Sequence, residues 1–275
     1  MKIRLIATDL DGTLVNPAKQ ITERTMQALQ AAADAGIHIV PTTGRLFHVI
    51  PEVLRKSGFV RYGICMNGGQ VYDAQVDSVL HRDEIPLEEA LQVYEWLERY
   101  PVAYDCYVND SARMERSTLE NLGDYIRGDS YGLALAKSFR TPVDGFREHI
   151  LKLGVPLQKM QVFTSDQELR MSILRELQQA FPSLSVTWSL PYNIEINTAT
   201  AVKGNALRKL CSHLGIPMEE VAAFGDGTND ITMLQAAGVS VAMANAVLEV
   251  KAAARYETAS NAEDGVAQFI ETYIL

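Results

Sequence analysis

The fold class can first be inferred from the segment Asp9-Leu10-Asp11-Gly12-Thr13-Leu14. It follows a short apolar segment, residues 3–8, a pattern typical of a buried strand that ends in a polar loop. The carboxylates of Asp9 and Asp11 are two residues apart, so in a continued strand they would lie on the same side. Like charges this close need a cation or a shared proton, and Mg²⁺ prefers such oxygen ligands. The stretch therefore predicts a charged site at the end of the first strand.

Two other interpretations of this acidic stretch have to be weighed. A calcium loop of the EF-hand type needs Asp or Asn at its fifth position and Gly at its sixth, where Thr13 and Leu14 stand, so that class of site is excluded. A solvated acidic turn stays open as long as the stretch is considered alone.

The segments around residues 9–14 alternate between strand and helix patterns. Apolar side chains recur at helical spacing over residues 22–37, with Thr22 as the expected N-cap and Gly36 as the expected end. The other elements expected here are strands over 38–40 and 64–66 and an amphipathic helix over 47–56. Such alternation predicts βαβ units and a parallel sheet, in which ligands bind beyond the carboxyl ends of the strands.

The pattern changes after Asn67-Gly68, a dipeptide that predicts a hairpin turn. The elements expected beyond it are helices over 86–100, 119–127, 142–153 and 166–181, and strands over 103–108, 159–164, 185–189 and 193–197. Strands and helices without strict alternation indicate a separate α+β domain. Alternation resumes with a helix over 203–214, strands over 221–224 and 239–242, and helices that follow each of these strands, the last over 263–273. We therefore expect a Rossmann-like α/β core formed by 1–84 and 198–275, with an α+β domain inserted over 85–197.

A second acidic loop, Gly225-Asp226-Gly227-Thr228-Asn229-Asp230, follows the strand expected over 221–224. Its glycines allow a close approach to a ligand. The loop has neither the lysine and spacing of a Walker loop nor the pattern of a dinucleotide-binding loop. Alone, it could equally be a turn whose Asp or Asn caps the next helix.

Two further motifs offer groups for binding an anion. Thr42-Thr43-Gly44-Arg45 stands where a strand meets a helix start, and hydroxyls with unpaired backbone amides bind anions there. Simple N-capping by Thr42 or Thr43 is the alternative. Lys203-Gly204 offers a point charge for phosphate, although a single lysine is usually an ordinary surface residue. All four motifs lie at strand ends or helix starts of one expected parallel sheet, so the topology brings them together.

In this order, the four motifs resemble those of the haloacid dehalogenase (HAD) superfamily of phosphohydrolases. Between Thr13 and Thr43 there is room for one helix and one strand, and the long insertion comes between Thr43 and Lys203. This position is similar to that in the Cof-type subfamily, whose phosphatases carry a type C2 (C2B) cap. The Met66-Asn67-Gly68-Gly69 turn and Glu195-Ile196 also look like that subfamily. The resemblance implies a HAD-like core and an inserted cap domain that determines substrate specificity.

The resemblance also implies roles for single residues. Asp9 would be the nucleophile that forms an aspartyl-phosphate, and Asp11 the general acid and then the general base. Mg²⁺ would be held by Asp9, Asp226 and the main-chain oxygen of Asp11. Asp230 would orient Lys203 or a metal-bound water. The phosphoryl oxygens would be bound by Leu10 (through its amide), Thr43, Gly44, Lys203 and Asn229.

Composition excludes several other classes of protein. The 275 residues contain 25 Lys and Arg against 34 Asp and Glu, a net charge of −9, which disfavours binding to nucleic acid or to an anionic membrane. Three cysteines are too few and odd in number for a disulfide framework, and no segment reaches the roughly 20 apolar residues of a membrane span. We expect a cytoplasmic protein with no nucleic-acid or membrane partner.

The function that these observations predict is a Mg²⁺-dependent phosphatase. It would hydrolyse small phosphorylated metabolites, with sugar phosphates the first expectation, through an aspartyl-phosphate. A phosphotransferase or mutase with the same intermediate and a non-catalytic sensor of phospho-ligands are the alternatives. The cap residues that could reach a sugar, unless they are simply exposed, are Arg113, Arg116, Arg127, Tyr192 and Asn193. The sequence predicts neither the physiological substrate nor whether the protein is a monomer or a homodimer.

Overall fold

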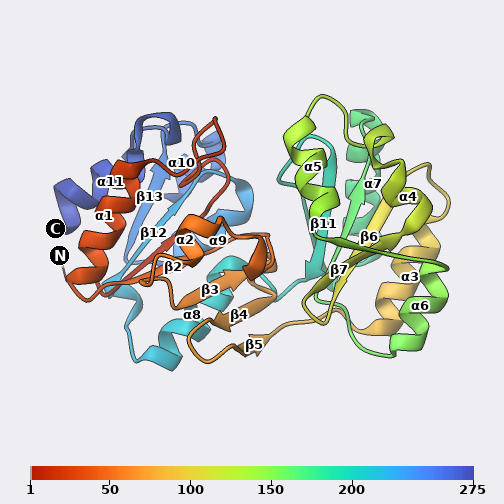
Figure 1. Ribbon diagram of the computed structural model, residues 1–275, viewed down its shortest axis with the longest axis horizontal. Helices are drawn as coiled ribbons and strands as arrows, with labels where there is room; N and C mark the ends of the chain where they lie inside the picture. Colours follow the sequence, from red (N-terminus) through yellow and green to blue (C-terminus); the bar gives the residue numbers. More distant parts are fainter. Residues whose placement is uncertain (1) are drawn as a thin grey trace. The chain divides into compact units, whose positions relative to one another are not determined.

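The structure is a computed structural model that describes residues 2–275, and the chain divides into two compact units. One unit comprises the chain up to Arg82 together with Val202–Leu275, and the other comprises Asp83–Ala201. In Figure 1 the red and blue ends of the chain form the first unit, and the yellow and green middle forms the second. We call them the core unit and the cap unit.

A parallel sheet of five strands forms the centre of the core unit. Its strands, in spatial order, are β14 (Tyr256–Thr258), β13 (Val239–Met243), β12 (Val221–Gly225), β1 (Leu5–Thr8) and β2 (His38–Pro41). Every neighbouring pair is parallel. The predicted α/β class with a parallel-sheet core is therefore confirmed.

Helices cover both faces of this sheet, which is why β1, β12 and β13 are buried along their whole length. Leu5 and Ala7 of β1 pack with Leu207 and Leu210 of α8 (Lys203–Leu214). The same face carries α9 (Ile231–Ala236) and α10 (Leu248–Ala253). In Figure 1, α1 (Glu23–Asp34) and α11 (Gly265–Phe269) lie side by side on the other face. The predicted N-cap of α1 is confirmed, because the Thr22 hydroxyl accepts a hydrogen bond from the Thr25 amide at 3.1 Å.

A small antiparallel sheet completes the core unit and corrects two predictions. It contains β3 (Tyr62–Cys65), β4 (Gln70–Asp73) and β5 (Ser78–Arg82). The hairpin predicted at Asn67-Gly68 joins β3 to β4. Strand β3 therefore pairs with β4 and is not the third strand of the parallel sheet. A single bridge between Thr42 and Ile64 links β3 to the loop after β2. The helix predicted over 47–56 is also wrong. Pro51, which has no N–H to donate, separates a 3₁₀ turn (η1, Phe47–Val49) from α2 (Glu52–Arg55).

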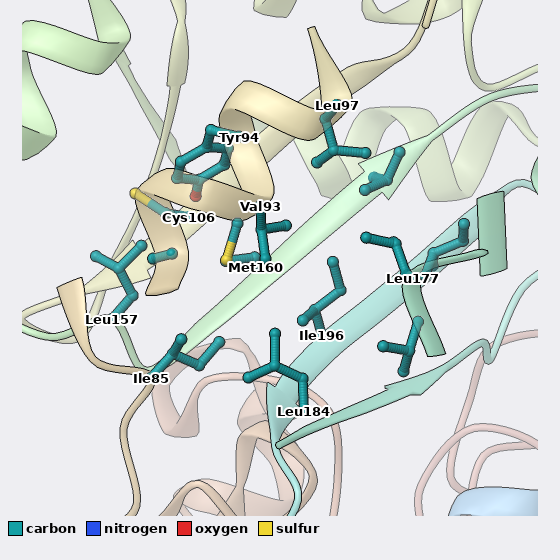
Figure 2. Packing of buried hydrophobic residues seen from close by; sticks show 14 of the residues in the cluster. Ile85, Val93, Tyr94, Leu97, Cys106, Leu157, Met160, Leu177, Leu184 and Ile196 are labelled. Carbon is teal, nitrogen blue, oxygen red and sulfur yellow. The ribbon is translucent and has the colours of Figure 1, made fainter. Parts of the chain in front are cut away.

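The cap unit is built on a six-stranded sheet. In spatial order its strands are β10 (Leu184–Thr187), β11 (Asn193–Thr198), β9 (Lys159–Phe163), β6 (Ala103–Val108), β7 (Ser111–Glu115) and β8 (Arg140–Val143). One face packs against α3 (Leu87–Leu97), α6 (Phe146–Leu153) and α7 (Gln167–Ala180). Figure 2 shows Val93 and Tyr94 of α3 beside Cys106 and Met160 of the sheet. A smaller apolar cluster with Leu122 and Ala136 involves η3 (Leu122–Asp124) and α5 (Ser130–Ser138).

Several elements differ from the predicted ones. The helix expected over 119–127 is replaced by α4 (Arg116–Glu120) and the 3₁₀ turn η3. The start of the helix expected over 142–153 is β8, an edge strand that tolerates Pro142. The predictions missed β5, β7, α5, α10 and β14. The terminal helix begins at Gly265 and continues as a π-helical turn over Ile270–Ile274.

Within residues 2–275 we find no helix with the length and apolar character that a bilayer crossing requires. Helix α7, for example, has 14 residues, whereas a membrane span needs about 20.

Candidate active site

The parallel register brings the motif loops to one edge of the core sheet. Thr8, the last residue of β1, pairs with Phe224 of β12 and with Pro41 of β2. The loops that follow these three strands therefore leave the sheet together. The Asp9 amide donates to the Phe224 carbonyl at 3.0 Å, and the Thr42 amide donates to the Thr8 carbonyl at 2.8 Å.

Lys203, the first residue of α8, is completely buried and contacts two carboxylates. Its Nζ lies 2.5 Å from Oδ1 of Asp9 and 2.6 Å from Oδ1 of Asp230. Burial alone would lower the pKa of Lys203, but the two carboxylates outweigh burial and raise that pKa above its ordinary value. Lys203 is therefore a fixed positive charge at Asp9, and not the solvated surface lysine that the sequence left open.

Asp230 connects Lys203 to the second acidic loop. While its Oδ1 accepts from Lys203, its Oδ2 accepts from the amides of Asp226 and Gly227, each at 3.0 Å. The side chain thus binds two amides that precede it in the loop and holds the lysine at the same time, and it makes no capping bond to α9. Both oxygens of Asp230 are engaged.

The first acidic loop holds Asp226 in place. The hydroxyl of Thr13 donates to Oδ1 of Asp226 at 2.7 Å. Gly12 has a left-handed φ of 88°, and a Cβ there would come within 2.2 Å of Oδ2 of Asp226. Only glycine allows this approach. Thr13 is a site residue to which the sequence interpretation gave no role, although it stands within the quoted motif.

Asp9, Asp226 and Asp230 form a carboxylate cluster. Oxygen atoms from the three lie within 4.8 Å of one another. Burial raises the pKa of Asp9 well above its ordinary value, and burial together with Asp230 raises the pKa of Asp226 to about 6. Lys203 alone does not balance three carboxylates. An excess of hard oxygen donors fits Mg²⁺, which would relieve their repulsion.

The side chain of Asp11 lies outside this cluster. It is bound in a bidentate manner by Arg45, with Nε 2.9 Å from Oδ2 and Nη2 2.6 Å from Oδ1. The Arg45 side chain is 14% exposed and that of Asp11 42%. Arg45 also donates to the Val49 carbonyl at 3.3 Å. Arg45 belongs to a quoted motif, but its pairing with Asp11, 34 positions away, could not be predicted from the sequence pattern.

The predicted phosphate-binding residues lie in the same region of the core unit. The buried Thr43 donates its amide to the Ile64 carbonyl at 2.8 Å, and its hydroxyl accepts from the Arg45 amide at 3.2 Å. The next helical turn has Leu46 as its N-cap, so neither Thr42 nor Thr43 caps a helix. Leu10 and Gly44 belong to the loops after β1 and β2. Nδ2 of Asn229 donates to Oδ1 of Asn67 at 3.1 Å.

The cap residues that could reach a sugar are mostly engaged within their own unit. Arg127 is exposed. Arg113 contacts His149, and Arg116 contacts Asp144. Tyr192 donates to Asp129, and Asn193 accepts from the amides of Ser189 and Leu190. These contacts give the four residues structural roles within the cap unit.

Comparisons with known proteins give the same assignment as the motifs. The family model described as haloacid dehalogenase-like hydrolase matches residues 6–270. Pyridoxal phosphate phosphatase YbhA of Escherichia coli (strain K12) is 32% identical over 278 residues, which cover 100% of both chains. The 5-amino-6-(5-phospho-D-ribitylamino)uracil phosphatase YcsE of Bacillus subtilis (strain 168) is 32% identical over 282 residues, covering 99% of this chain and 96% of that protein.

Solved structures agree over nearly the whole chain. A haloacid dehalogenase-like hydrolase from B. subtilis has a TM-score of 0.83 at 28% identity, covering 99% of this chain and 100% of that one. The HAD subclass IIB sugar phosphatase BT4131 has a TM-score of 0.83 at 25% identity, covering 98% of both chains. The chain therefore belongs to the haloacid dehalogenase-like hydrolases of the Cof type, as the resemblance of its four motifs predicted.

Proposed function

We propose that this protein is a Mg²⁺-dependent phosphatase that hydrolyses small phosphorylated metabolites through an aspartyl-phosphate. The observation that carries the proposal is the position of Asp9. Its side chain is 9% exposed, is held by Lys203 and lies in a cluster with an excess of negative charge. A buried carboxylate of this kind can attack a phosphoryl group, because the neighbouring cation, Lys203, offsets the negative charge of that group.

The reaction would take place in two steps on Asp9 and Asp11. A carboxylate oxygen of Asp9 attacks phosphorus in line, the ester oxygen leaves with a proton from Asp11, and the alcohol departs. Asp11 then takes a proton from water, which attacks the aspartyl-phosphate, releases inorganic phosphate and restores Asp9. Arg45 would hold the side chain of Asp11 while it is ionised, and this contact would loosen when Asp11 carries the proton. The groups that would hold the phosphoryl oxygens are Lys203, Thr43, Asn229 and the amides of Leu10 and Gly44.

The carboxylate cluster also supports the metal assignment. Asp9, Asp226 and the main-chain oxygen of Asp11 would hold Mg²⁺, because both oxygens of Asp230 are already bonded to Lys203 and to backbone amides. When bound, Mg²⁺ offsets the repulsion between carboxylate and phosphate and stabilises the charge of the transition state. Asp230 would then be an orienting residue for Lys203.

The substrate class rests on the relatives and on the cap. The names of the related phosphatases include pyridoxal phosphate, a phosphorylated ribitylaminouracil and a sugar phosphate class. Their shared feature is a phosphomonoester on a small molecule. We propose sugar phosphates as the first substrate class for this chain and residues 85–197 as the domain that selects them. We also propose that the protein acts in the cytoplasm.

The test is phosphate release from a panel of sugar, nucleotide and cofactor monophosphates, with Mg²⁺ and with a chelator. Asp9→Asn should lower kcat by about 10³-fold or more, since it removes the nucleophile at constant volume. Asp34→Asn, at an exposed position of α1, is the matched control and should keep full activity. Release that persists in Asp9→Asn, or with the chelator present, would contradict the proposal. Phosphate binding without release would point to a sensor.

A further inference from the structure

The turn η2 (Met66–Gly68), between β3 and β4, has an unusual backbone. Met66 and Asn67 both adopt left-handed φ values, 52° and 58°, and Gly68 follows at 106°. Left-handed backbone costs a residue with a Cβ about 1–2 kcal/mol, and Asn tolerates it better than most. Such strain persists where the surroundings enforce it, and it concentrates at functional sites.

The surroundings of this turn are the loops of the candidate active site. The Asn67 amide donates to the Thr43 carbonyl at 3.0 Å, and the Met66 amide donates to the Arg45 carbonyl at 3.1 Å. A Cβ on Gly68 would come within 2.5 Å of the carbonyl of Val202, the residue that precedes Lys203. The turn therefore touches the threonine loop and the start of α8.

The side chain of Asn67 reaches a third motif. It is 5% exposed, and its Oδ1 accepts from Nδ2 of Asn229 at 3.1 Å. An amide has a donor end and an acceptor end, so the acceptor that the buried Asn67 presents favours one of the two orientations of the Asn229 amide. Rotation of the Asn229 amide by half a turn would bring two oxygens together, and that arrangement is repulsive.

We propose that Asn67 is a positioning residue of the phosphoryl site. It orients the side-chain amide of Asn229, and its turn sets the spacing between the Thr43 loop and Lys203. This inference rests on the proposed function, because it assigns Asn67 to the same site. The competing explanation is that Asn67 is only a residue that suits a left-handed turn.

Asn67→Gly separates the two explanations. Glycine adopts the left-handed backbone without cost but has no side chain, so the turn is kept and the contact with Asn229 is lost. We expect kcat/KM for phosphate esters to fall about tenfold, mainly through KM, while the melting temperature stays at or above that of the wild type. Asn109→Gly replaces another left-handed asparagine, in the cap unit at φ 49°, and should leave kcat/KM unchanged.

The double variant Asn67→Gly/Asn229→Ala completes the test. If Asn67 acts through Asn229, the double variant should be no worse than Asn229→Ala alone, since the orienting residue has nothing left to orient. The dissociation constant of inorganic phosphate, measured by calorimetry, should show the same lack of additivity.

Two results with the variants overturn the inference. Asn67→Gly with kcat/KM within twofold of the wild type would leave Asn67 as a turn residue only. Losses that multiply in the double variant would show that Asn67 acts independently of Asn229. If the wild type binds inorganic phosphate but hydrolyses no phosphate ester, only the proposed function is contradicted, because the phosphate affinities of the single and double variants still test Asn67. If the wild type neither binds phosphate nor hydrolyses esters, the proposed function and the role of Asn67 are both contradicted.

Discussion

Both units bury charged side chains, but they balance them differently. In the cap unit two buried cations each have one acid: Lys159 lies 2.8 Å from Glu195 and Arg140 lies 2.6 Å from Asp105. Gln161 joins the two pairs, accepting from Arg140 at 2.8 Å and donating to Glu195 at 3.1 Å. Within these two pairs the number of positive charges equals the number of negative charges, and a further buried cation, Arg170, lies over the Trp188 ring.

The core unit does not reach that balance. Lys203 serves Asp9 and Asp230 together, and Asp226 completes a cluster of three acids around one lysine. A balanced pair holds a fold together and needs nothing more, whereas an excess of buried negative charge is costly unless a cation joins it. We therefore expect the buried charges of the cap pairs to stabilise the fold and those around Lys203 to serve catalysis. Variants of Lys203 and Lys159 test this distinction most strongly.

Replacement of Lys203 should have the largest effect on activity. Lys203→Met removes the cation beside Asp9 and leaves three carboxylates together, so we expect kcat/KM to fall by about 10³-fold or more. Lys209→Met, at an exposed position on the same helix, should retain wild-type rates. Phosphate-release kinetics with saturating Mg²⁺ measure both. If Lys203→Met kept more than a tenth of the activity, the core charges would be structural, like those of the cap.

Replacement of Lys159 should instead affect stability. Lys159→Met leaves Glu195 buried without its cation, which costs about 3–5 kcal/mol of unfolding free energy. We expect denaturant melts to show this loss, while the Mg²⁺ affinity of the folded fraction stays unchanged. Weaker Mg²⁺ binding in this variant would contradict the assignment of a purely structural role to the Lys159–Glu195 pair.

The Asp11–Arg45 pair predicts a dependence on the leaving group. Asp11→Asn cannot donate a proton, so hydrolysis of alkyl phosphates should fall about 10²-fold or more, and that of an aryl phosphate with a good leaving group much less. Arg45→Met should show the same bias more weakly, because it frees the carboxylate without removing it. Equal losses on both substrate types would mean that Asp11 has no role as general acid.

The smallest expected effect is the pH dependence of Mg²⁺ binding. Burial and Asp230 raise the pKa of Asp226 to about 6, so protonation competes with the metal as the pH falls through that value. From this one group, affinity should weaken roughly fourfold between pH 7.5 and 5.5, and binding should release protons. Calorimetry in buffers of different ionisation enthalpy reports both. An affinity independent of pH would remove the carboxylate cluster as the metal site.

Much of this arrangement could be predicted from local patterns. Short apolar runs ending in Asp9 and Asp226 identified strands of the parallel sheet, and parallel register alone brings their ends together. The pairing of β3 was missed because Asn67-Gly68 predicts a hairpin without showing that the hairpin removes β3 from the larger sheet. Secondary structure in the cap was less predictable, because Gly123 and Pro142 interrupt patterns that otherwise suggest helices.

The contacts missed at the site are all between side chains far apart in the sequence. Arg45 meets Asp11 and Asn67 meets Asn229, across separations of 34 and 162 residues. Neither residue type signals such a partner by itself. Thr13 shows the same limit within a motif, since its hydroxyl acts on Asp226, 213 residues away.

The central claim is that the excess charge around Asp9 serves a covalent phosphoryl transfer, and acid quenching followed by peptide mass spectrometry tests it most directly. Enzyme quenched during turnover with Mg²⁺ should carry one phosphoryl group on the peptide that contains Asp9, and Asp9→Asn should carry none. Rapid phosphate release without any phosphorylated peptide, together with activity retained in Asp9→Asn, would contradict the account.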